Sequence, residues 1–177
     1  MPRNVEIKAR VADLEAARHN AARLSGEPCT LLTQEDTFFQ VPKGRLKLRV
    51  LSPSEAQLIY YERADRAGPK TSNYFVTPVA DPSSLLAVLS AGLGVRGVVR
   101  KQRWLYMVGR TRIHLDLVEG LGSFLELEVM LAPEEPEESG RQVAVRLMEA
   151  LGVRQEDLVQ GAYMDLLSSS DAAPEVR

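Results

Sequence analysis

Charged residues two or four positions apart recur along this sequence. The five groups are Glu6 and Lys8; Lys47 and Arg49; Lys101 and Arg103; Arg112 and Asp116; and Glu126 and Glu128. In an extended strand such spacing places the charges of each group on one face. Lysine and arginine bind phosphate oxygens, and carboxylates bind hard divalent cations. If these faces converge, they favour binding of a polyanion together with a metal ion. A sheet with one solvated face would show the same alternation.

The overall charge of the chain does not reveal this grouping. The 177 residues include 22 Lys and Arg against 24 Asp and Glu, for a net charge of -2. That balance excludes a strongly basic nucleic-acid-binding protein. A single cysteine, Cys29, excludes an internal disulfide and a cysteine-rich zinc site. With no apolar run of transmembrane length and no signal-peptide core, the sequence predicts a cytoplasmic protein without a membrane partner.

Alternation of polar and apolar residues predicts the strands that would position these charges. The predicted strands span residues 3–11, 30–40, 45–51, 57–63, 72–79, 95–108, 111–118 and 124–131. Their links are short, and Gly109-Arg110 is typical of a hairpin turn. We therefore expect an α+β protein built on a closed or nearly closed eight-stranded antiparallel β-barrel with flanking helices.

Three flanking helices are predicted by their end signals. One spans 13–24, with Asp13 as N-cap and Gly26 closing it; a second spans 82–91. The third begins near Pro136 and ends at Gly152. Residues 1–167 are predicted to form a single domain, and 168–177 a disordered C-terminal tail.

The charged groups also stand in a familiar order. The segments Asn4-Val-Glu-Ile-Lys8, Lys47-Leu-Arg49 and Lys101-Gln-Arg103 precede a run from Arg112 through Asp116 and a Leu-Gly turn to Glu126-Leu-Glu128. This order resembles the CYTH superfamily, the triphosphate tunnel metalloenzymes, over residues 3 to about 167. The superfamily includes class IV adenylyl cyclases, thiamine triphosphatases and inorganic triphosphatases. The resemblance implies a barrel that holds a triphosphate inside a charged tunnel.

The resemblance also implies residue roles. Metal-site residues for Mg²⁺ or Mn²⁺ would be Glu6, Glu126, Glu128 and, in the first position of the metal motif, Asn4. Triphosphate-binding residues would be Lys8, Lys47, Arg49, Lys70, Lys101, Arg103 and Arg112. Residues close to the reaction would be Lys8, Arg63 and Asp116.

Two positions depart from the superfamily pattern. Asn4 stands where the signature has a glutamate, so the motif has one negative charge fewer. Glu62 stands where many members have a lysine before the arginine, and Arg63 or Lys70 would supply the missing cation. The Asn4 departure bears on metal affinity and on a second metal site.

Three functions remain open. The first is metal-dependent hydrolysis of inorganic triphosphate, thiamine triphosphate or a nucleoside triphosphate. The second is an adenylyl cyclase of the class IV type, which converts ATP to cyclic AMP and pyrophosphate. The third is a non-catalytic binder of triphosphate or polyphosphate. All three imply a small triphosphate-containing partner and no nucleic acid, and the sequence fits a monomer or a homodimer.

A few other residues allow two interpretations. His114 shares the polar face of Asp116, and its position fits a hydrogen-bonding role in the tunnel or, as the simpler interpretation, a place on the strand surface. His19 is predicted to lie exposed on a helix, and Cys29 to be a small packed residue. Tyr163 is predicted to hold the C-terminal segment against the barrel.

Overall fold

The computed structural model describes residues 2–170. Its strands are β1 (Arg3–Arg10), β2 (Thr30–Phe39), β3 (Arg45–Ser52), β4 (Glu55–Arg63), β5 (Lys70–Val79), β6 (Val95–Val108), β7 (Thr111–Val118) and β8 (Gly122–Leu131). Its helices are α1 (Leu14–Ser25), α2 (Pro82–Leu93), α3 (Glu137–Ala150) and α4 (Tyr163–Ser170), with a short 3-10 helix, η1 (Gln155–Asp157). The predicted α+β class is confirmed.

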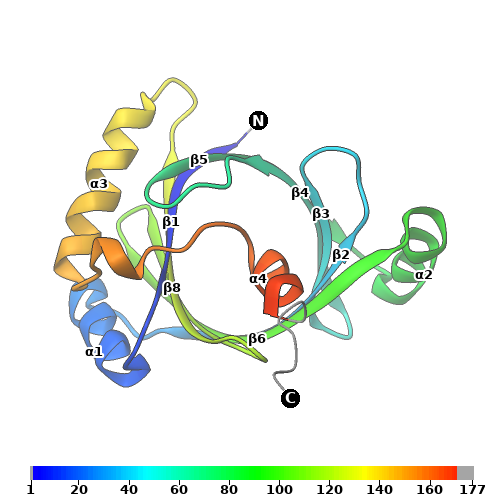
Figure 1. Cartoon of the computed structure of the whole chain (residues 1–177), viewed down its shortest axis with the longest axis horizontal. Coiled ribbons are helices and arrows are strands. Elements are labelled where there is room, and N and C mark those ends of the chain that lie inside the picture. Colours follow the sequence, from blue (N-terminus) through cyan, green and yellow to red (C-terminus); the bar gives the residue numbers. More distant parts are fainter. Residues whose placement is uncertain (1, 171–177) are drawn as a thin grey trace, which may run out of the picture.

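The strands close into one barrel, which Figure 1 shows nearly end-on. Their order around the ring is β1-β5-β4-β3-β2-β6-β7-β8, and each neighbouring pair is antiparallel. The N-terminal strand β1 closes the ring, because it pairs with β5 on one side and β8 on the other. The predicted closed eight-stranded antiparallel barrel is therefore confirmed.

The hydrophobic core lies outside the barrel wall. Ile7, Leu115 and Leu127 are at most 1% exposed and pack, together with Met148 of α3, in one cluster beneath α1 and α3. Since successive residues of a strand point to opposite faces, apolar outward positions leave the polar positions inside. Burial of the outer face against the helices thus stabilises the barrel while its interior stays charged.

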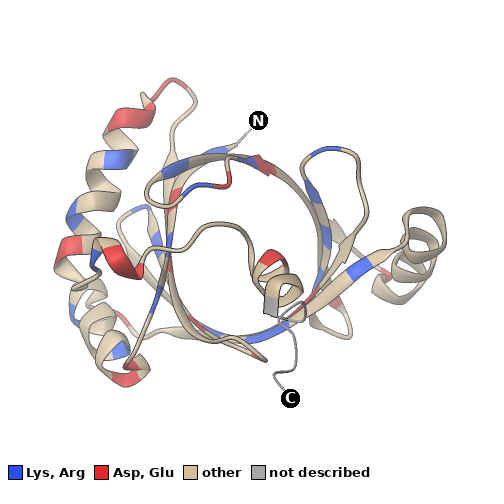
Figure 2. Ribbon diagram, viewed as in Figure 1, with Lys and Arg blue, Asp and Glu red and all other residues tan. Residues whose placement is uncertain are grey.

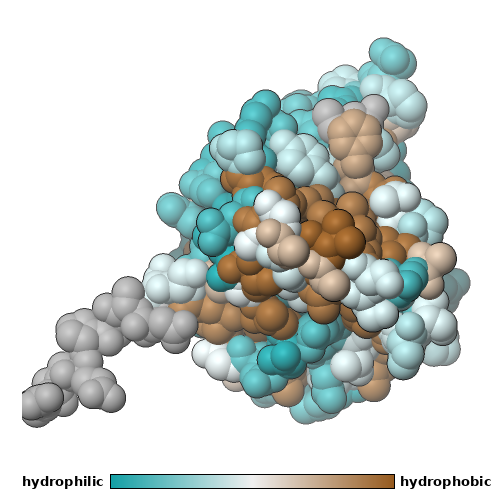
Figure 3. Space-filling view, turned by 90° about the vertical axis from the view of Figure 1, so that its right-hand side faces the viewer, coloured by the Kyte–Doolittle hydropathy of each residue, from teal (hydrophilic) through white to brown (hydrophobic). Residues whose placement is uncertain are grey.

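Helix α1 begins and ends as its capping residues predict. The Asp13 carboxylate accepts a hydrogen bond from the Ala16 backbone N–H at 2.9 Å, and Gly26 adopts a left-handed φ of 69° after the last turn. On the other side of the molecule, α2 packs Leu85, Leu86 and Leu89 near the outer face of β2 and β3. Figure 3 shows an apolar surface on the side that carries α2, where Val88 is 66% exposed.

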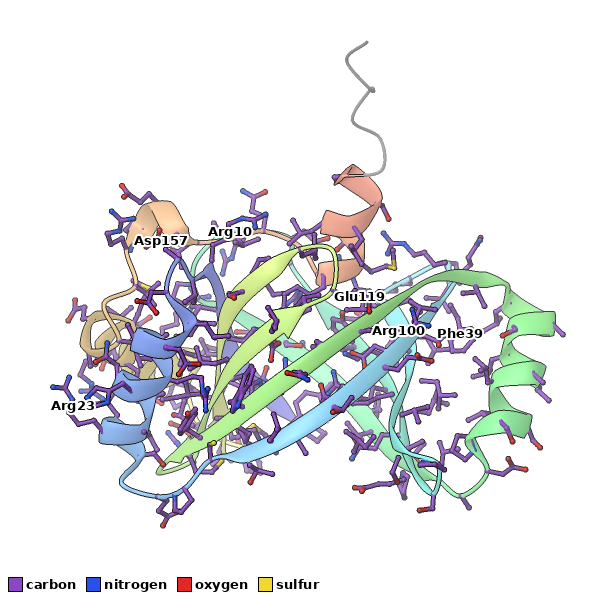
Figure 4. All side chains as sticks on the ribbon, turned by 90° about the horizontal axis from the view of Figure 1, so that it is seen from below. Arg10, Arg23, Phe39, Arg100, Glu119 and Asp157 are labelled. Atoms are coloured by element: carbon purple, nitrogen blue, oxygen red, sulfur yellow. The ribbon has the colours of Figure 1, made fainter. Side chains whose placement is uncertain are left out.

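Helix α4 covers one end of the barrel, as Figures 1 and 4 show from two directions. The Tyr163 ring lies 5.0 Å from that of Phe124, edge to face. Just before the helix, the Val159 N–H donates to the carbonyl of Lys8 at 2.9 Å. The predicted role of Tyr163 in holding the C-terminal segment against the barrel is confirmed by these contacts.

Some boundaries differ from the predictions. Helix α2 continues two residues beyond the predicted end, to Leu93, because Gly94 rather than Gly92 caps it. Helix α4 was not predicted, and it includes residues 168–170, where the tail was expected to begin. The rest of the predicted tail, 171–177, lies outside the described residues. Within residues 2–170, no helix is long and apolar enough to span a membrane.

Candidate functional site

The barrel encloses a cavity of about 380 Å³ to which all eight strands contribute. Figure 2 shows basic and acidic segments on the strands around the ring. Among the described residues, seven basic side chains line the cavity: Lys8, Lys47, Arg49, Arg63, Lys101, Arg103 and Arg112. Four acidic side chains and one histidine line it too: Glu6, Asp36, Glu126, Glu128 and His114. The structure therefore brings most of the charged residues predicted for the site into one chamber.

One side of the chamber, which we call the cationic wall, consists of Asp36, Lys47, Arg49 and Lys101 on the adjacent strands β2, β3 and β6. The Asp36 carboxylate is 1% exposed and accepts hydrogen bonds from Lys47 Nζ at 2.8 Å and from Arg49 Nε and Nη2 at 2.7 Å. Lys101 Nζ lies 3.7 Å from Asp36 Oδ2. A single carboxylate therefore holds three cations in place.

Burial and crowding change the protonation of this wall. Burial would raise the pKa of Asp36, but Arg49 and Lys47 hold it well below its usual range. Burial, together with the charge of Arg103, lowers the pKa of Lys101 to about 7. Burial beside Arg49 lowers the pKa of Lys47 to about 8. These lysines are therefore near their titration points at neutral pH, and a bound anion would favour their charged forms.

A second group, which we call the carboxylate wall, consists of Lys8, His114, Glu126 and Glu128 on the adjacent strands β1, β7 and β8, and it adjoins the cationic wall where β7 pairs with β6. Glu126 accepts from Lys8 Nζ at 3.0 Å and from Arg103 Nη2 at 2.6 Å. Glu128 has one weak partner, Arg112 Nη1, at 3.4 Å from its Oε2. Burial opposes ionisation of Glu126, but Lys8 and Arg103 hold its pKa well below the usual range.

His114 lies inside this wall, so the interpretation of a strand-surface histidine is wrong. The residue is 4% exposed, and its Nδ1 lies 3.8 Å from both Glu126 Oε2 and Glu128 Oε1. Burial, reinforced by the charge of Arg103, lowers the pKa of His114, which favours the neutral imidazole. One ligand atom from each of the three residues lies within 4.8 Å of the other two. Such a group has the composition of a metal site.

The N-terminal metal motif is placed beside this group. Glu6 points into the cavity, where it forms an ion pair with Arg63, whose Nη2 also donates to the carbonyl of Gly161 at 2.7 Å. Asn4 lines the same cavity at 4% exposure, and its Oδ1 has no hydrogen-bond partner among residues 2–170. Glu6 thus contacts the predicted catalytic residue Arg63, and Asn4 offers a free amide oxygen.

Two predicted site residues lie behind the cavity surface. Lys70 is fully buried and donates from Nζ to the carbonyl of Arg66 at 3.0 Å. Asp116 is fully buried and accepts from Arg103 at 2.7 and 2.6 Å and from the Tyr163 hydroxyl at 2.9 Å. Neither lines the cavity, so Asp116 can act on a ligand only through the lining residues that it contacts, chiefly Arg103.

The sequence pattern missed Asp36, which organises the cationic wall. Its strand was predicted, but Glu35 and Asp36 put adjacent charges on opposite faces, which breaks the two-residue spacing seen elsewhere. Gln34, Asp36 and Phe38 are two residues apart and all line the cavity, so this spacing could have predicted that Asp36 faces inward.

The end of the cavity away from α4 has an apolar rim. Four apolar lining side chains are not fully buried: Leu32, Leu51, Val76 and Leu105. Lys101 Nζ lies 5.0 Å from the Tyr163 ring at the covered end. Leu105, four residues further along β6, is therefore about 13 Å from that position. Arg112 lies opposite Met107, still further along β6, and its side chain is 43% exposed, so the open end of the cavity carries a charged group among the apolar side chains.

Comparisons with known proteins agree with this geometry. Adenylate cyclase CyaB of Aeromonas hydrophila is 29% identical over 176 residues, covering 94% of this chain and 89% of the relative. The PH1012 protein of Pyrococcus horikoshii OT3 has a TM-score of 0.82 at 27% identity and covers 92% of this chain and 98% of its own. HpAC1 from Hippeastrum, for which a dominant triphosphatase activity is described, shares the fold at 17% identity, with a TM-score of 0.66 and coverage of 97% and 98%.

The family comparison covers nearly all of the described chain. The model of the CYTH domain matches residues 2–163, from the start of β1 to the first residue of α4. This match and the similarity to an adenylate cyclase support a triphosphate-related enzymatic function. The chain belongs to the CYTH domain family.

Proposed function

We propose that the protein is a metal-dependent hydrolase of a triphosphate bound inside the barrel. The observation that carries the proposal is the cavity itself, in which seven basic side chains outnumber four acidic ones while two of the acids face an unpaired imidazole. An excess of three positive charges suits a polyanion, and a divalent cation would bring the total close to the charge of a triphosphate ester.

The cationic wall would bind the phosphate oxygens. Arg49 presents a planar fork of donors, and Lys47 and Lys101 add point charges on either side of Asp36. An entering phosphate would take over donors that now contact Asp36. Phosphoryl transfer depends mainly on positioning and on neutralising charge, and a wall of prearranged cations supplies both.

The carboxylate wall would hold Mg²⁺ or Mn²⁺. Glu128 Oε1 has no hydrogen-bond partner within the part of the chain that the structure describes, so an oxygen ligand is available there, next to Glu126. Arg63 contacts only Oε1 of Glu6, so Glu6 could join through its other oxygen, and Asn4 would offer its free amide oxygen. When bound, the cation would lower the pKa of a water molecule and neutralise phosphate oxygens.

The remaining predicted catalytic residues would then have separate tasks. Lys8 Nζ lies 3.0 Å from Glu126 and 3.6 Å from the centre of the Tyr163 ring, which places its charge at the covered end of the cavity. Arg63 would steady the terminal phosphate or Glu6. Asp116 would act as a positioning residue, since it fixes the Arg103 guanidinium through two hydrogen bonds.

The second candidate function is formation of cyclic AMP and pyrophosphate from ATP. Two observations favour it: the 29% identity to adenylate cyclase CyaB and the partly exposed apolar side chains that line the cavity, which suit an organic group on the triphosphate. In this reaction the ribose 3′-hydroxyl attacks the α-phosphorus, its proton is lost, and pyrophosphate leaves. The same walls would bind the phosphates.

Product analysis separates these functions. The protein is incubated with Mg²⁺ or Mn²⁺ and with ATP, inorganic triphosphate or thiamine triphosphate, and the products are separated by chromatography. Free phosphate supports the hydrolase, and cyclic AMP with pyrophosphate supports the cyclase. Binding of triphosphate without turnover of any substrate would contradict both and leave a binding protein. Where Glu126→Gln is compared with the wild type in this assay, the matched control is Glu119→Gln, because Glu119 is exposed on the hairpin that also carries Glu126 (Figure 4).

A further inference from the structure

The imidazole of His114 is in an unusual position for a buried polar group. Its Nδ1 is buried and has no hydrogen-bond partner within residues 2–170, although the side chain lines a polar cavity. A buried polar atom without a partner is costly, and native structures rarely keep one without a reason. The nearest acceptors, Glu126 Oε2 and Glu128 Oε1, both lie at 3.8 Å, beyond hydrogen-bonding distance.

A cation between these three atoms would resolve the arrangement. Ligand atoms that share one ion at about 2.1 Å lie about 3–4 Å apart, so separations of 3.8 Å require little movement. The three residues come from adjacent positions on the paired strands β7 and β8, where His114 lies opposite Glu126. The rigid barrel wall therefore presents one nitrogen and two carboxylates to a single point.

We propose that His114 Nδ1 is a third, nitrogen ligand of the divalent cation held by Glu126 and Glu128, and that the site therefore prefers Mn²⁺ to Mg²⁺. Imidazole nitrogen suits transition metals, whereas Mg²⁺ favours oxygen ligands and sheds its water reluctantly. The inference deepens the proposed metal dependence and rests on a metal being bound in the tunnel. It assigns the ligand set and the preferred ion.

The cations around Glu126 do not prevent this ligation. Lys8 and Arg103 each contact one oxygen of Glu126, but a carboxylate oxygen has two lone pairs and can accept a second partner. Glu128 keeps Oε1 free, since Arg112 approaches Oε2. The Arg103 guanidinium is held by Asp116 as well, so it would stay in place beside the ion.

The test uses the spectroscopic signature of nitrogen ligation. Pulsed electron paramagnetic resonance of the Mn²⁺-loaded protein detects coupling between the ion and a directly bound ¹⁴N nucleus. The sequence contains two histidines, and the other, His19, is exposed on α1 outside the barrel. We expect imidazole ¹⁴N coupling in the wild type and in the matched control His19→Gln, and its loss in His114→Gln.

Metal titration provides the second measurement. For His114→Gln we expect Mn²⁺ affinity to fall by about tenfold or more, while Mg²⁺ affinity changes by less than about threefold, because only Mn²⁺ gains from the nitrogen. Mn²⁺ binding without ¹⁴N coupling, or coupling that persists in His114→Gln, would overturn the proposal. Both metal measurements are made without substrate, so they are independent of the hydrolysis assay. If the protein hydrolyses triphosphate but shows no ¹⁴N coupling, the assignment of His114 as a ligand is overturned and the proposed function still stands.

A measurement on the wild type covers the case in which His114→Gln fails to fold. Mn²⁺ broadens nuclear magnetic resonance signals close to it, so trace Mn²⁺ should erase the imidazole signals of His114 and leave those of His19. Equal broadening of both, or persistence of the His114 signals in protein shown to bind Mn²⁺, would refute ligation by His114.

Discussion

The two walls of the tunnel use the same kinds of side chain in opposite proportions. In the cationic wall, one carboxylate, Asp36, gathers three cations. In the carboxylate wall, Glu126 contacts Lys8 and Arg103, whereas Glu128 has a weak contact with Arg112 and both glutamates lie near the His114 imidazole. The first wall has donors in excess and the second has acceptors in excess. Under the proposed function, phosphate oxygens would replace Asp36 in the first wall, while a metal ion would satisfy acceptors in the second.

Most charged side chains of both walls contact an opposite charge before any ligand enters, although the cationic wall keeps an excess of positive charge. Buried charges persist in proteins only when they are paired, because desolvation of an isolated ion is very costly. A bound phosphate would therefore take over cations that now contact Asp36, whereas a metal ion could bind first to Glu128 Oε1, which has no hydrogen-bond partner within residues 2–170. The following five experiments, from the largest expected effect to the smallest, test whether the walls act separately.

Replacing Asp36 with asparagine should be the most damaging change to the empty protein. It leaves Lys47, Arg49 and Lys101 buried without their counter-charge, so the free energy of unfolding should fall by about 3 kcal/mol. Denaturant unfolding measures this, and triphosphate should restore more stability than it adds to the wild type. Glu35→Gln, at the adjacent exposed ion pair, is the control. If the two changes lowered the free energy of unfolding equally, Asp36 would not be the group that stabilises the cations of the cationic wall.

Replacing Arg49 with alanine should weaken triphosphate binding about 100-fold even without metal. The variant loses a forked, charge-assisted donor in a confined site. Titration calorimetry in a chelating buffer measures the affinity. Arg100→Ala is the control, since Arg100 is exposed and pairs with Glu35 (Figure 4). If Arg49→Ala bound triphosphate with wild-type affinity, the proposal that the cationic wall binds the phosphate oxygens would be wrong.

Replacing Glu126 with glutamine should lower metal-dependent turnover more than tenfold. The same change should not weaken metal-free triphosphate binding, because it frees Lys8 and Arg103 from their shared acceptor. Steady-state rates and chelated titrations measure the two quantities, with Glu119→Gln as control. If turnover and metal-free triphosphate affinity both fell, the two walls would not bind metal and phosphate independently.

Raising the pH from 7 to 9 should weaken metal-free triphosphate binding by about tenfold or more. Burial beside Arg103 lowers the pKa of Lys101 to about 7 in the empty protein, and burial beside Arg49 lowers that of Lys47 to about 8. Above these values both lysines are neutral, so binding an anion must first take up protons, and affinity falls as the pH rises.

The pH effect has its own control variants. Lys101→Arg keeps its charge throughout this range and should flatten the pH dependence, whereas Lys43→Arg on the exposed β2–β3 turn should not. A pH dependence that is identical in all three proteins would show that the lysines of the cationic wall do not set it.

Replacing Asn4 with glutamate should raise metal affinity a few-fold, the smallest of these effects. Asn4 lies on the same face of β1 as Glu6, and its amide oxygen, which has no hydrogen-bond partner within residues 2–170, is directed to the cavity. Gln57→Glu adds the same charge to the cavity from β4 and is the matched control. Unchanged metal affinity and turnover in Asn4→Glu would show that position 4 does not adjoin the ion.

The fold was largely predictable because the signals for its elements are local. Alternation defined Thr111–Val118 to the residue, the Gly109-Arg110 turn marked the end of Val95–Val108, and Asp13 with Gly26 defined α1. Helix α4 escaped because its eight residues include three serines and little helical pattern. It is held instead by tertiary contacts, the Tyr163 ring against Phe124 and Lys8.

The candidate site was only partly predictable because depth inside a barrel depends on strand stagger. Lys70 has the correct parity, as it lies opposite Glu6, yet it donates to Arg66 and does not line the cavity. Asp36 and His114 reach the walls because β2 and β7 carry them to the level of the other charges. Sequence spacing indicates the face of a strand but not the height of a residue on it.

The closure of the ring by β1 also determines the order in which the protein can be completed during synthesis. Arg3 of β1 lies opposite Leu131 of β8, the last strand of the barrel, so all eight strands must be synthesised before β1 has both neighbours. Until then the growing chain carries unpaired strand edges, which are templates for association with other chains. Once β8 arrives, every edge is consumed in one step, and the same step brings together the residues of the carboxylate wall.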